Sequence, residues 1–78
     1  MIRVLIKYVG GIAEYTGKKE EYIELKEQTR LSEPVDMVRE KYGIKDELIV
    51  LVNGVPARMD TLFKNGDKVS ILHSISGG

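Results

Sequence analysis

The sequence has no cysteine. A chain without thiols forms no disulfide, holds no iron–sulfur cluster through cysteine and has no cysteine nucleophile. It also has a single histidine, His73, which is too few for a zinc site built of cysteine and histidine ligands. We therefore expect no metal or cofactor to be bound by the chain itself.

An excess of charge of one sign is also absent, because 12 Lys and Arg balance 12 Asp and Glu. Nucleic-acid binding normally needs a basic surplus on one face, and this balance argues against it. The longest aliphatic run, Leu48 to Val52, is far shorter than the ~20 residues of a membrane-spanning helix. We expect a cytoplasmic protein that binds neither nucleic acid nor membrane.

Length limits the function further. A chain of 78 residues makes one small domain that buries only ~60 % of its unfolded surface. So small a core leaves little room for a catalytic cleft. The composition therefore favours a binding or carrier module over a self-sufficient enzyme.

Residue periodicity predicts four strands and a short return strand. Residues 2–9 and 20–26 alternate apolar with polar side chains, and residues 47–52 and 68–73 are rich in β-branched and aliphatic residues. A helical turn over residues 12–16 ends at Gly17. The Asn53-Gly54 pair favours a tight hairpin turn into a strand over residues 55–58.

One longer helix is expected after these first strands. Leu31, Val35, Val38 and Tyr42 recur at helical spacing and form one apolar stripe. Ser32 is the expected N-cap, Pro34 is tolerated in the first turn, and Gly43 ends the helix. Further along, Leu62 and Phe63 are expected to anchor the connection to the last strand.

This order of elements predicts an α+β fold, a mixed sheet of four to five strands with one main helix on one face. The first and last strands lie side by side at its centre and bury Val4, Ile6, Val69 and Ile71 under the helix. This is the β-grasp, or ubiquitin-like, arrangement. The domain is expected over residues 1–73, followed by a flexible tail over residues 74–78.

The tail ends in Gly77-Gly78 after Ser74-Ile75-Ser76. One interpretation is a frayed terminus. The other is that the carboxylate of Gly78 is the reactive group, because an extended tail of this length reaches up to ~18 Å into a partner. Glycine lacks Cβ, so the end of the tail can pass a narrow channel.

Three motifs carry a resemblance to a known family. They are Val52-Asn53-Gly54, the run from Leu62 through Gly66-Asp67-Lys68-Val69 to Leu72, and the closing Ser76-Gly77-Gly78. Their order and spacing resemble the MoaD/ThiS family of ubiquitin-like sulfur carriers, and the length is closest to the small subunit of molybdopterin synthase. The chain departs from many members at His73-Ser74, where these carry two prolines.

The resemblance implies a function for the tail. A ubiquitin-activating-type enzyme would use ATP and magnesium to adenylate Gly78, and a sulfur donor would convert the adenylate to a thiocarboxylate. Gly77 would accompany Gly78 into the large subunit of molybdopterin synthase, and the chain alone would not be catalytic. Thiamine or tungsten-cofactor biosynthesis, conjugation to lysines of other proteins, and an adaptor role without tail chemistry remain alternatives.

A partner surface is expected on the sheet face away from the helix. By strand alternation Leu5, Leu51 and Leu72 point outward from three adjacent strands, and we expect them to form an exposed apolar cluster. Ile75 and Ser76 would extend this surface into the tail. His73 is expected to be an ordinary surface side chain.

Overall fold

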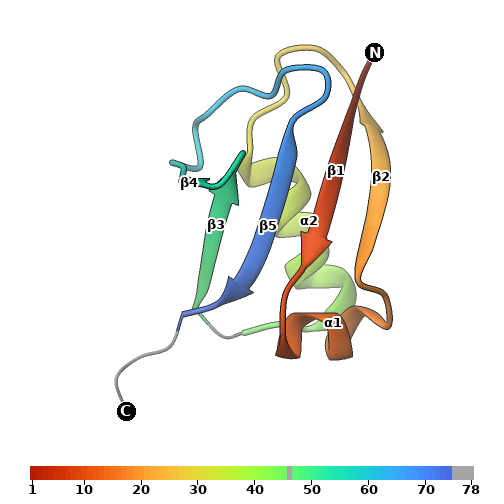
Figure 1. Cartoon of the computed structure of the whole chain (residues 1–78), viewed down its shortest axis with the longest axis vertical. Coiled ribbons are helices and arrows are strands. Elements are labelled where there is room, and N and C mark those ends of the chain that lie inside the picture. Colours follow the sequence, from red (N-terminus) through yellow and green to blue (C-terminus); the bar gives the residue numbers. More distant parts are fainter. Residues whose placement is uncertain (46, 75–78) are drawn as a thin grey trace.

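The computed structural model describes residues 1–45 and 47–74. It contains one five-stranded mixed sheet in the order β2-β1-β5-β3-β4, with the longer helix α2 behind one face (Figure 1). The elements in chain order are β1 (Ile2–Tyr8), α1 (Gly11–Thr16), β2 (Glu20–Leu25), α2 (Ser32–Tyr42), β3 (Leu48–Val52), β4 (Val55–Pro56) and β5 (Lys68–His73). In the described residues, no helix is both long and apolar enough to span a bilayer.

The centre of the sheet is a parallel pair formed by β1 and β5, in which Ile6 lies opposite Val69 and Tyr8 opposite Ile71. Exposure of the side chains confirms the predicted core, since Val69 is 1 % exposed and Ile71 is fully buried. These side chains face α2, whose Val35 belongs to the same buried cluster. The first and last strands of the chain thus contribute to one core.

Helix α2 has the predicted end but not the predicted cap. Gly43 follows it in the left-handed conformation at φ 64°, which glycine adopts without strain. The N-cap is Leu31 and no side chain caps it, so the assignment of Ser32 as N-cap is wrong. Instead, the Glu33 carboxylate accepts a hydrogen bond at 2.9 Å from the amide of Arg30, the residue before the N-cap.

The Asn53-Gly54 turn is confirmed, with φ values of 54° and 82° that suit a tight hairpin. Asn53 also ties this turn to the start of β5, because its side-chain oxygen accepts the Lys68 amide at 3.0 Å. The return strand β4 ends at Pro56, earlier than predicted, and proline offers no amide to a strand ladder.

The connection between β4 and β5 is held by one of its two predicted anchors. Phe63 is 6 % exposed and belongs to the core, whereas Leu62 is 50 % exposed, so the prediction is wrong for Leu62. Phe63 also donates its amide to the Thr29 carbonyl at 3.1 Å. One buried aromatic ring thus anchors a connection whose other residues are mostly exposed.

Candidate functional site

The tail begins at the end of the central strand β5. The Ser74 amide donates to the Glu47 carbonyl at 3.0 Å, which extends the strand ladder one residue beyond His73. The predicted site residues Ile75, Ser76, Gly77 and Gly78 lie outside the described residues. The structure therefore gives the position of the tail's root, beside β3 and α1 at one end of the sheet (Figure 1).

His73, the last residue of β5, is half-buried rather than the plain surface side chain expected from sequence. Its ring stacks on Tyr15 of α1, with centroids 6.0 Å apart and planes 16° apart. A Cβ at Gly11 would come within 3.4 Å of the His73 ring, so glycine lets α1 pack closely here. Together with Glu14, these residues line a shallow groove at the root of the tail.

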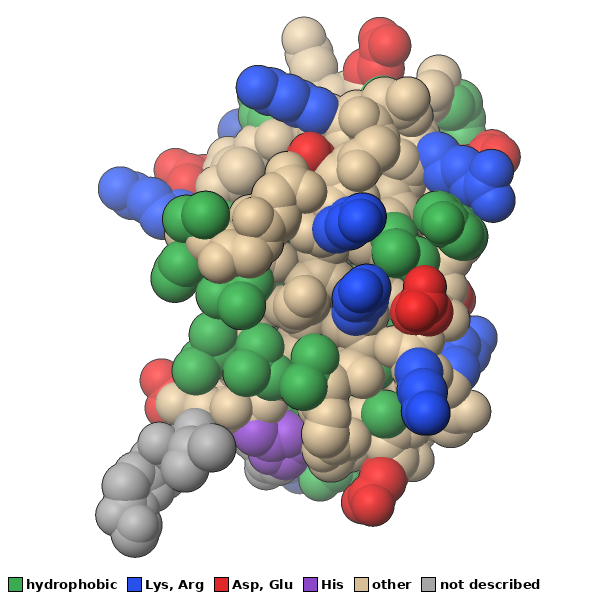
Figure 2. Space-filling model, in the orientation of Figure 1, with side chains coloured by type: hydrophobic (Ala, Val, Ile, Leu, Met, Phe, Trp, Pro, Cys, Tyr) green, Lys and Arg blue, Asp and Glu red, His purple; other side chains and the backbone are tan. Residues whose placement is uncertain are grey.

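The sheet face away from α2, called the outer face below, carries the predicted partner surface. Figure 2 shows hydrophobic side chains gathered on this face next to the histidine, near the end of the described chain. Leu51 lies opposite Ser70, and Ile49 lies opposite Leu72, in the β3–β5 pairing. Val9 joins them from the other side, because its amide bonds to the Ile71 carbonyl at 3.0 Å.

Four residues therefore form the apolar cluster of the outer face: Val9, Ile49, Leu51 and Leu72. Val9 is 44 % exposed and Ile49 is 38 % exposed, while Leu51 and Leu72 are partly buried. Sequence reasoning left Val9 and Ile49 out of the site. The alternation of residues 2–9 was the available signal for Val9, but only the strand register reveals that Ile49 lies beside Leu72.

Leu5 does not belong to this cluster. It lies opposite Lys68 in the β1–β5 pairing, four residues before Leu72, or roughly 13 Å along the strand. It is also only 8 % exposed, so the expectation that it is exposed is wrong. Arg3, Tyr22 and Lys68 line a groove with Leu5, and their long side chains cover it.

Cationic side chains accompany the apolar cluster on the outer face. Lys7 lies opposite Ser70 on β5, one register step from the cluster. Further along β1, the Arg3 guanidinium lies 4.3 Å from the centre of the Tyr22 ring. Glu20 and Glu24 of β2 lie opposite Lys7 and Arg3 in the β1–β2 pairing, so charges of both signs are present on this face.

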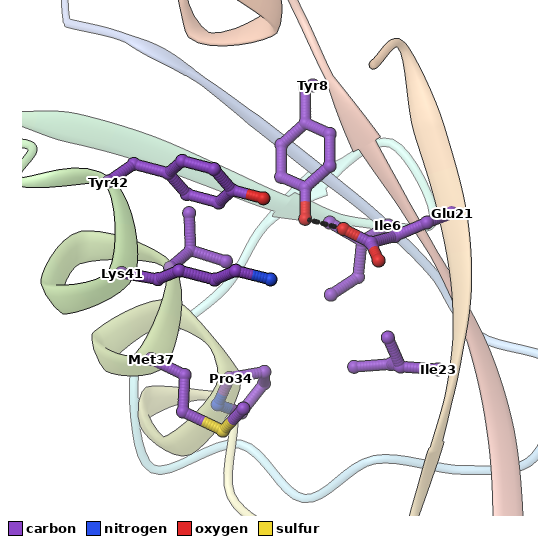
Figure 3. A pocket seen from close by; sticks show the side chains of 9 residues that line it. Ile6, Tyr8, Glu21, Ile23, Pro34, Met37, Lys41 and Tyr42 are labelled. Atoms are coloured by element: carbon purple, nitrogen blue, oxygen red, sulfur yellow. Dashed lines mark hydrogen bonds between the residues drawn. The ribbon is translucent and has the colours of Figure 1, made fainter. Parts of the chain in front are cut away.

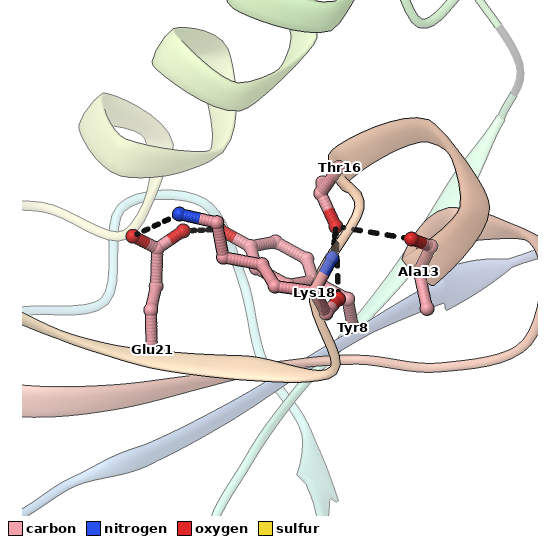
Figure 4. A network of polar contacts seen from close by, with 5 residues as sticks. All are labelled: Tyr8, Ala13, Thr16, Lys18 and Glu21. Carbon is pink, nitrogen blue, oxygen red and sulfur yellow. Dashed lines mark hydrogen bonds and ion pairs between the residues drawn. The ribbon is translucent and has the colours of Figure 1, made fainter.

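A polar network lies on the opposite, inner side of the sheet (Figure 4). The Tyr8 hydroxyl donates to the Glu21 carboxylate at 2.5 Å, and the Lys18 ammonium lies 3.4 Å from the other carboxylate oxygen. The Tyr8 bond is the main reason that the pKa of Glu21 is lowered, while partial burial opposes it. Burial first, and then Glu21, raises the pKa of Tyr8 above its ordinary value.

This network fastens β1 to β2 on the side of the sheet opposite the apolar cluster, so we assign it a structural role. Within the described part of the chain, no group of three or more metal-ligating side chains comes together. His73, Tyr15 and Glu14 line the groove at the root of the tail. The described residues thus combine a fixed tail root with an exposed apolar cluster.

A helix-covered mixed sheet with parallel first and last strands defines a ubiquitin-like β-grasp domain, as predicted. The chain belongs to the ThiS family, whose model matches residues 6–78, so the resemblance to the MoaD/ThiS sulfur carriers is confirmed. The match runs through Gly77 and Gly78. No curated protein matches the sequence.

Solved structures with the same fold include proteins from archaea and bacteria. A Pyrococcus furiosus protein described as subunit 1 of molybdopterin converting factor has a TM-score of 0.85 and 24 % identity, covering 96 % of this chain and 100 % of that one. Small archaeal modifier protein 1 of Haloferax volcanii has a TM-score of 0.77 and 16 % identity, covering 91 % and 95 %.

A third structure contains a protein–protein complex. It is the complex of subunits 1 and 2 of the molybdopterin-converting factor of Helicobacter pylori, with a TM-score of 0.70 and 23 % identity over 99 % of this chain and 100 % of that one. At these identities the likeness establishes the β-grasp fold.

Proposed function

We propose that the chain is a sulfur carrier whose working group is the carboxylate of Gly78, and that it serves molybdopterin biosynthesis as the small subunit of molybdopterin synthase. The observation that carries this proposal is the family match over residues 6–78, which includes the terminal glycine pair. The chain would not be catalytic alone.

The chemistry requires an activating partner. A carboxylate is a poor electrophile, so a ubiquitin-activating-type enzyme would first join the Gly78 carboxylate to the α-phosphate of ATP, with magnesium, and release pyrophosphate. A sulfur donor, such as an enzyme-bound persulfide, would then displace AMP and leave a thiocarboxylate after reduction of the donor's sulfur–sulfur bond by a thiol. The sulfur thus resides on the main chain, which is compatible with a carrier that has no cysteine.

The geometry supports this proposal at the root of the tail. Ser74 is bonded to Glu47, so the body fixes the point from which the last residues extend. The apolar cluster borders the same end of β5, which lets one partner hold the outer face and receive the tail. Ile75 and Ser76 would contact that partner, and Gly77 and Gly78 would enter its active site.

The proposed partners are an adenylating enzyme, a sulfur donor and a large synthase subunit. A two-subunit complex is known from the Helicobacter pylori relative, and a β-grasp chain also lies in the complex of BexX and CysO from Amycolatopsis orientalis. We propose that the apolar cluster of this chain is the surface through which such partners bind.

The test is the intact mass of the chain recovered from the organism that encodes it. We expect a fraction of the molecules to carry one oxygen-for-sulfur exchange, located on the peptide that contains Gly78. Deleting Gly78, or adding one alanine after it, should abolish this species while the circular dichroism spectrum and melting temperature stay unchanged. Thiolation of either variant would contradict the proposal.

The same experiment separates the alternative function. Small archaeal modifier protein 1 shares the fold, and a modifier uses the same activated Gly78 with lysine amines as acceptors. Covalent ladders on denaturing gels that disappear with Gly78 would identify a modifier. Co-purification with a large synthase subunit, without ladders, supports the molybdopterin pathway.

A further inference from the structure

Strand β2 is an unpaired edge of the sheet. In the described structure it pairs with β1 only. The Tyr8 amide bonds to the Lys19 carbonyl at 2.8 Å, and antiparallel pairing alternates from there. Glu20, Tyr22 and Glu24 therefore direct their backbone N–H and C=O groups away from the sheet, where another strand can pair with them.

A groove runs beside this edge, between β2 and α2. Figure 3 shows Ile23 of β2 facing Pro34 and Met37 of α2 across it. Ile6 and Val38 complete its apolar lining, and Tyr8, Glu21, Lys41 and Tyr42 form its polar end. Its volume is about 100 Å³, which accommodates side chains rather than a cofactor, since cofactor sites begin near ~300 Å³.

The exposed side chain of Met37 distinguishes this groove from an ordinary edge of a sheet. It is 65 % exposed on the rim of the groove, although it is apolar, and methionine adapts to the shape of an incoming side chain. An added strand at the β2 edge would place every second side chain over this groove and the others toward the outer face. The groove therefore selects aliphatic residues at alternate positions.

The charges on β2 define the other positions. Glu20 and Glu24 lie on the outer-face side of the strand, next to Lys7 and Arg3 of β1. On the side away from β1, neither glutamate has a neighbouring strand in the described sheet, and the added strand would lie there. A second copy of this chain pairing through β2 would bring glutamates together across the new ladder, which is destabilising. Lysine or arginine at the outward positions is complementary.

We propose that the β2 edge and its groove form a second docking site, which binds an extended segment of a partner protein with alternating aliphatic and basic residues. Main-chain pairing supplies affinity and the alternate side chains supply specificity. β2 is separated from β5 by β1, so this site stays open when the outer-face cluster and tail engage another protein. The proposal goes beyond the tail chemistry and is independent of it.

The test uses the isotope-labelled full chain and two short synthetic peptides, one alternating lysine with valine and the other alternating glutamate with valine. We expect the lysine peptide to shift the nuclear magnetic resonance signals of Tyr22, Glu24 and the Met37 methyl group. It should also slow hydrogen exchange at the Tyr22 and Glu24 amides, and bind about tenfold more tightly than the glutamate peptide at low salt.

Two exposed residues provide a matched pair of variants. Met37→Glu should abolish binding of the lysine peptide, whereas Leu62→Glu, at a site that is 50 % exposed and outside the lining of the groove, should bind it as the unmodified chain does. Equal affinity for both peptides, or shifts confined to the outer face, would overturn the proposal. Self-association removed by Met37→Glu would overturn it too, by assigning the edge to a second copy.

Discussion

Tyr8 and Glu21 illustrate how a single contact makes stability depend on pH. The folded state lowers the pKa of Glu21, chiefly through the Tyr8 hydroxyl and then through Lys18. The unfolded chain therefore binds a proton more readily between the two pKa values. The contribution of Glu21 to stability is complete above the ordinary value of 4.5, and it is lost as the pH falls through the folded value.

Glu21→Gln tests this linkage. The variant should lose about 1 kcal/mol of unfolding free energy at pH 7, and the difference from the unmodified chain should shrink toward pH 3. Urea unfolding at several pH values measures it. Glu20→Gln is the control, since Glu20 is exposed and points to the opposite face of β2 from Glu21. Parallel pH profiles for the chain and Glu21→Gln would contradict the assignment.

Alkaline pH affects the same contact through its other partner, the Tyr8 hydroxyl. The pKa of Tyr8 is raised by burial and by Glu21, so its contribution to stability is present below the ordinary value of 10.0 and is lost above it. Tyr8→Phe keeps the buried ring and removes the hydroxyl. It should weaken the fold by about 1 kcal/mol at pH 7 and flatten the alkaline limb of the same urea profiles.

At the scale of the elements, the start of α2 shows what a sequence pattern leaves undecided. Serine before an apolar stripe is a strong N-cap signal, yet Ser32 lies within the first turn and Leu31 occupies the N-cap position. The Arg30 amide is satisfied by Glu33 instead. Leu31 is fully buried, so core packing, rather than the capping preference of Ser32, sets where the helix begins.

Ser32→Ala and Glu33→Ala test which of the two side chains stabilises the start of α2. Glu33→Ala should lower the unfolding free energy by roughly 0.5–1 kcal/mol, because it leaves the Arg30 amide without its partner and removes a negative charge from the first turn. Ser32→Ala should change it by less than about 0.5 kcal/mol. Thermal unfolding of both variants measures the difference. A larger loss of unfolding free energy in Ser32→Ala than in Glu33→Ala would identify Ser32 as the cap.

The predictable parts of the fold are those that depend on signals within a single element. Alternation, helical spacing and the glycines after each helix predicted every element to within a few residues, because these signals are local. The exposure of Leu5 and Leu62 was not predictable in this way. Whether an outward leucine is covered depends on long side chains from other strands, as Arg3 and Tyr22 cover Leu5, and no single segment encodes that.

At the scale of the whole molecule, the apolar cluster and the root of the tail share one end of the sheet. Sequence alone predicted Leu51 and Leu72 for this surface. It omitted Ile49 and Val9, since the β3–β5 register that places Ile49 beside Leu72 joins segments about 20 residues apart. The roles of Ile75, Ser76, Gly77 and Gly78 stay predictions, as these residues lie outside the described part.

Ile49→Lys tests the cluster without touching the tail. Ile49 is already 38 % exposed, so we expect a loss of stability below about 1 kcal/mol. The thiolated fraction in the native organism should fall several-fold, because a lysine in a desolvated interface disrupts partner binding. Leu62→Lys, at a site 50 % exposed and paired with Arg30 rather than with β3 or β5, is the control and should be thiolated normally.

The parallel pairing of β1 with β5 also determines when, during folding, the root of the tail reaches its position. These strands are separated by most of the chain, so the apolar side of β1 stays uncovered on one flank until β5 has joined it, and such long-range closure is slow. Residue 74 occupies its place only after that step. A partner that bound the apolar cluster would therefore recognise only chains in which β5 has joined β1, and not partly folded ones.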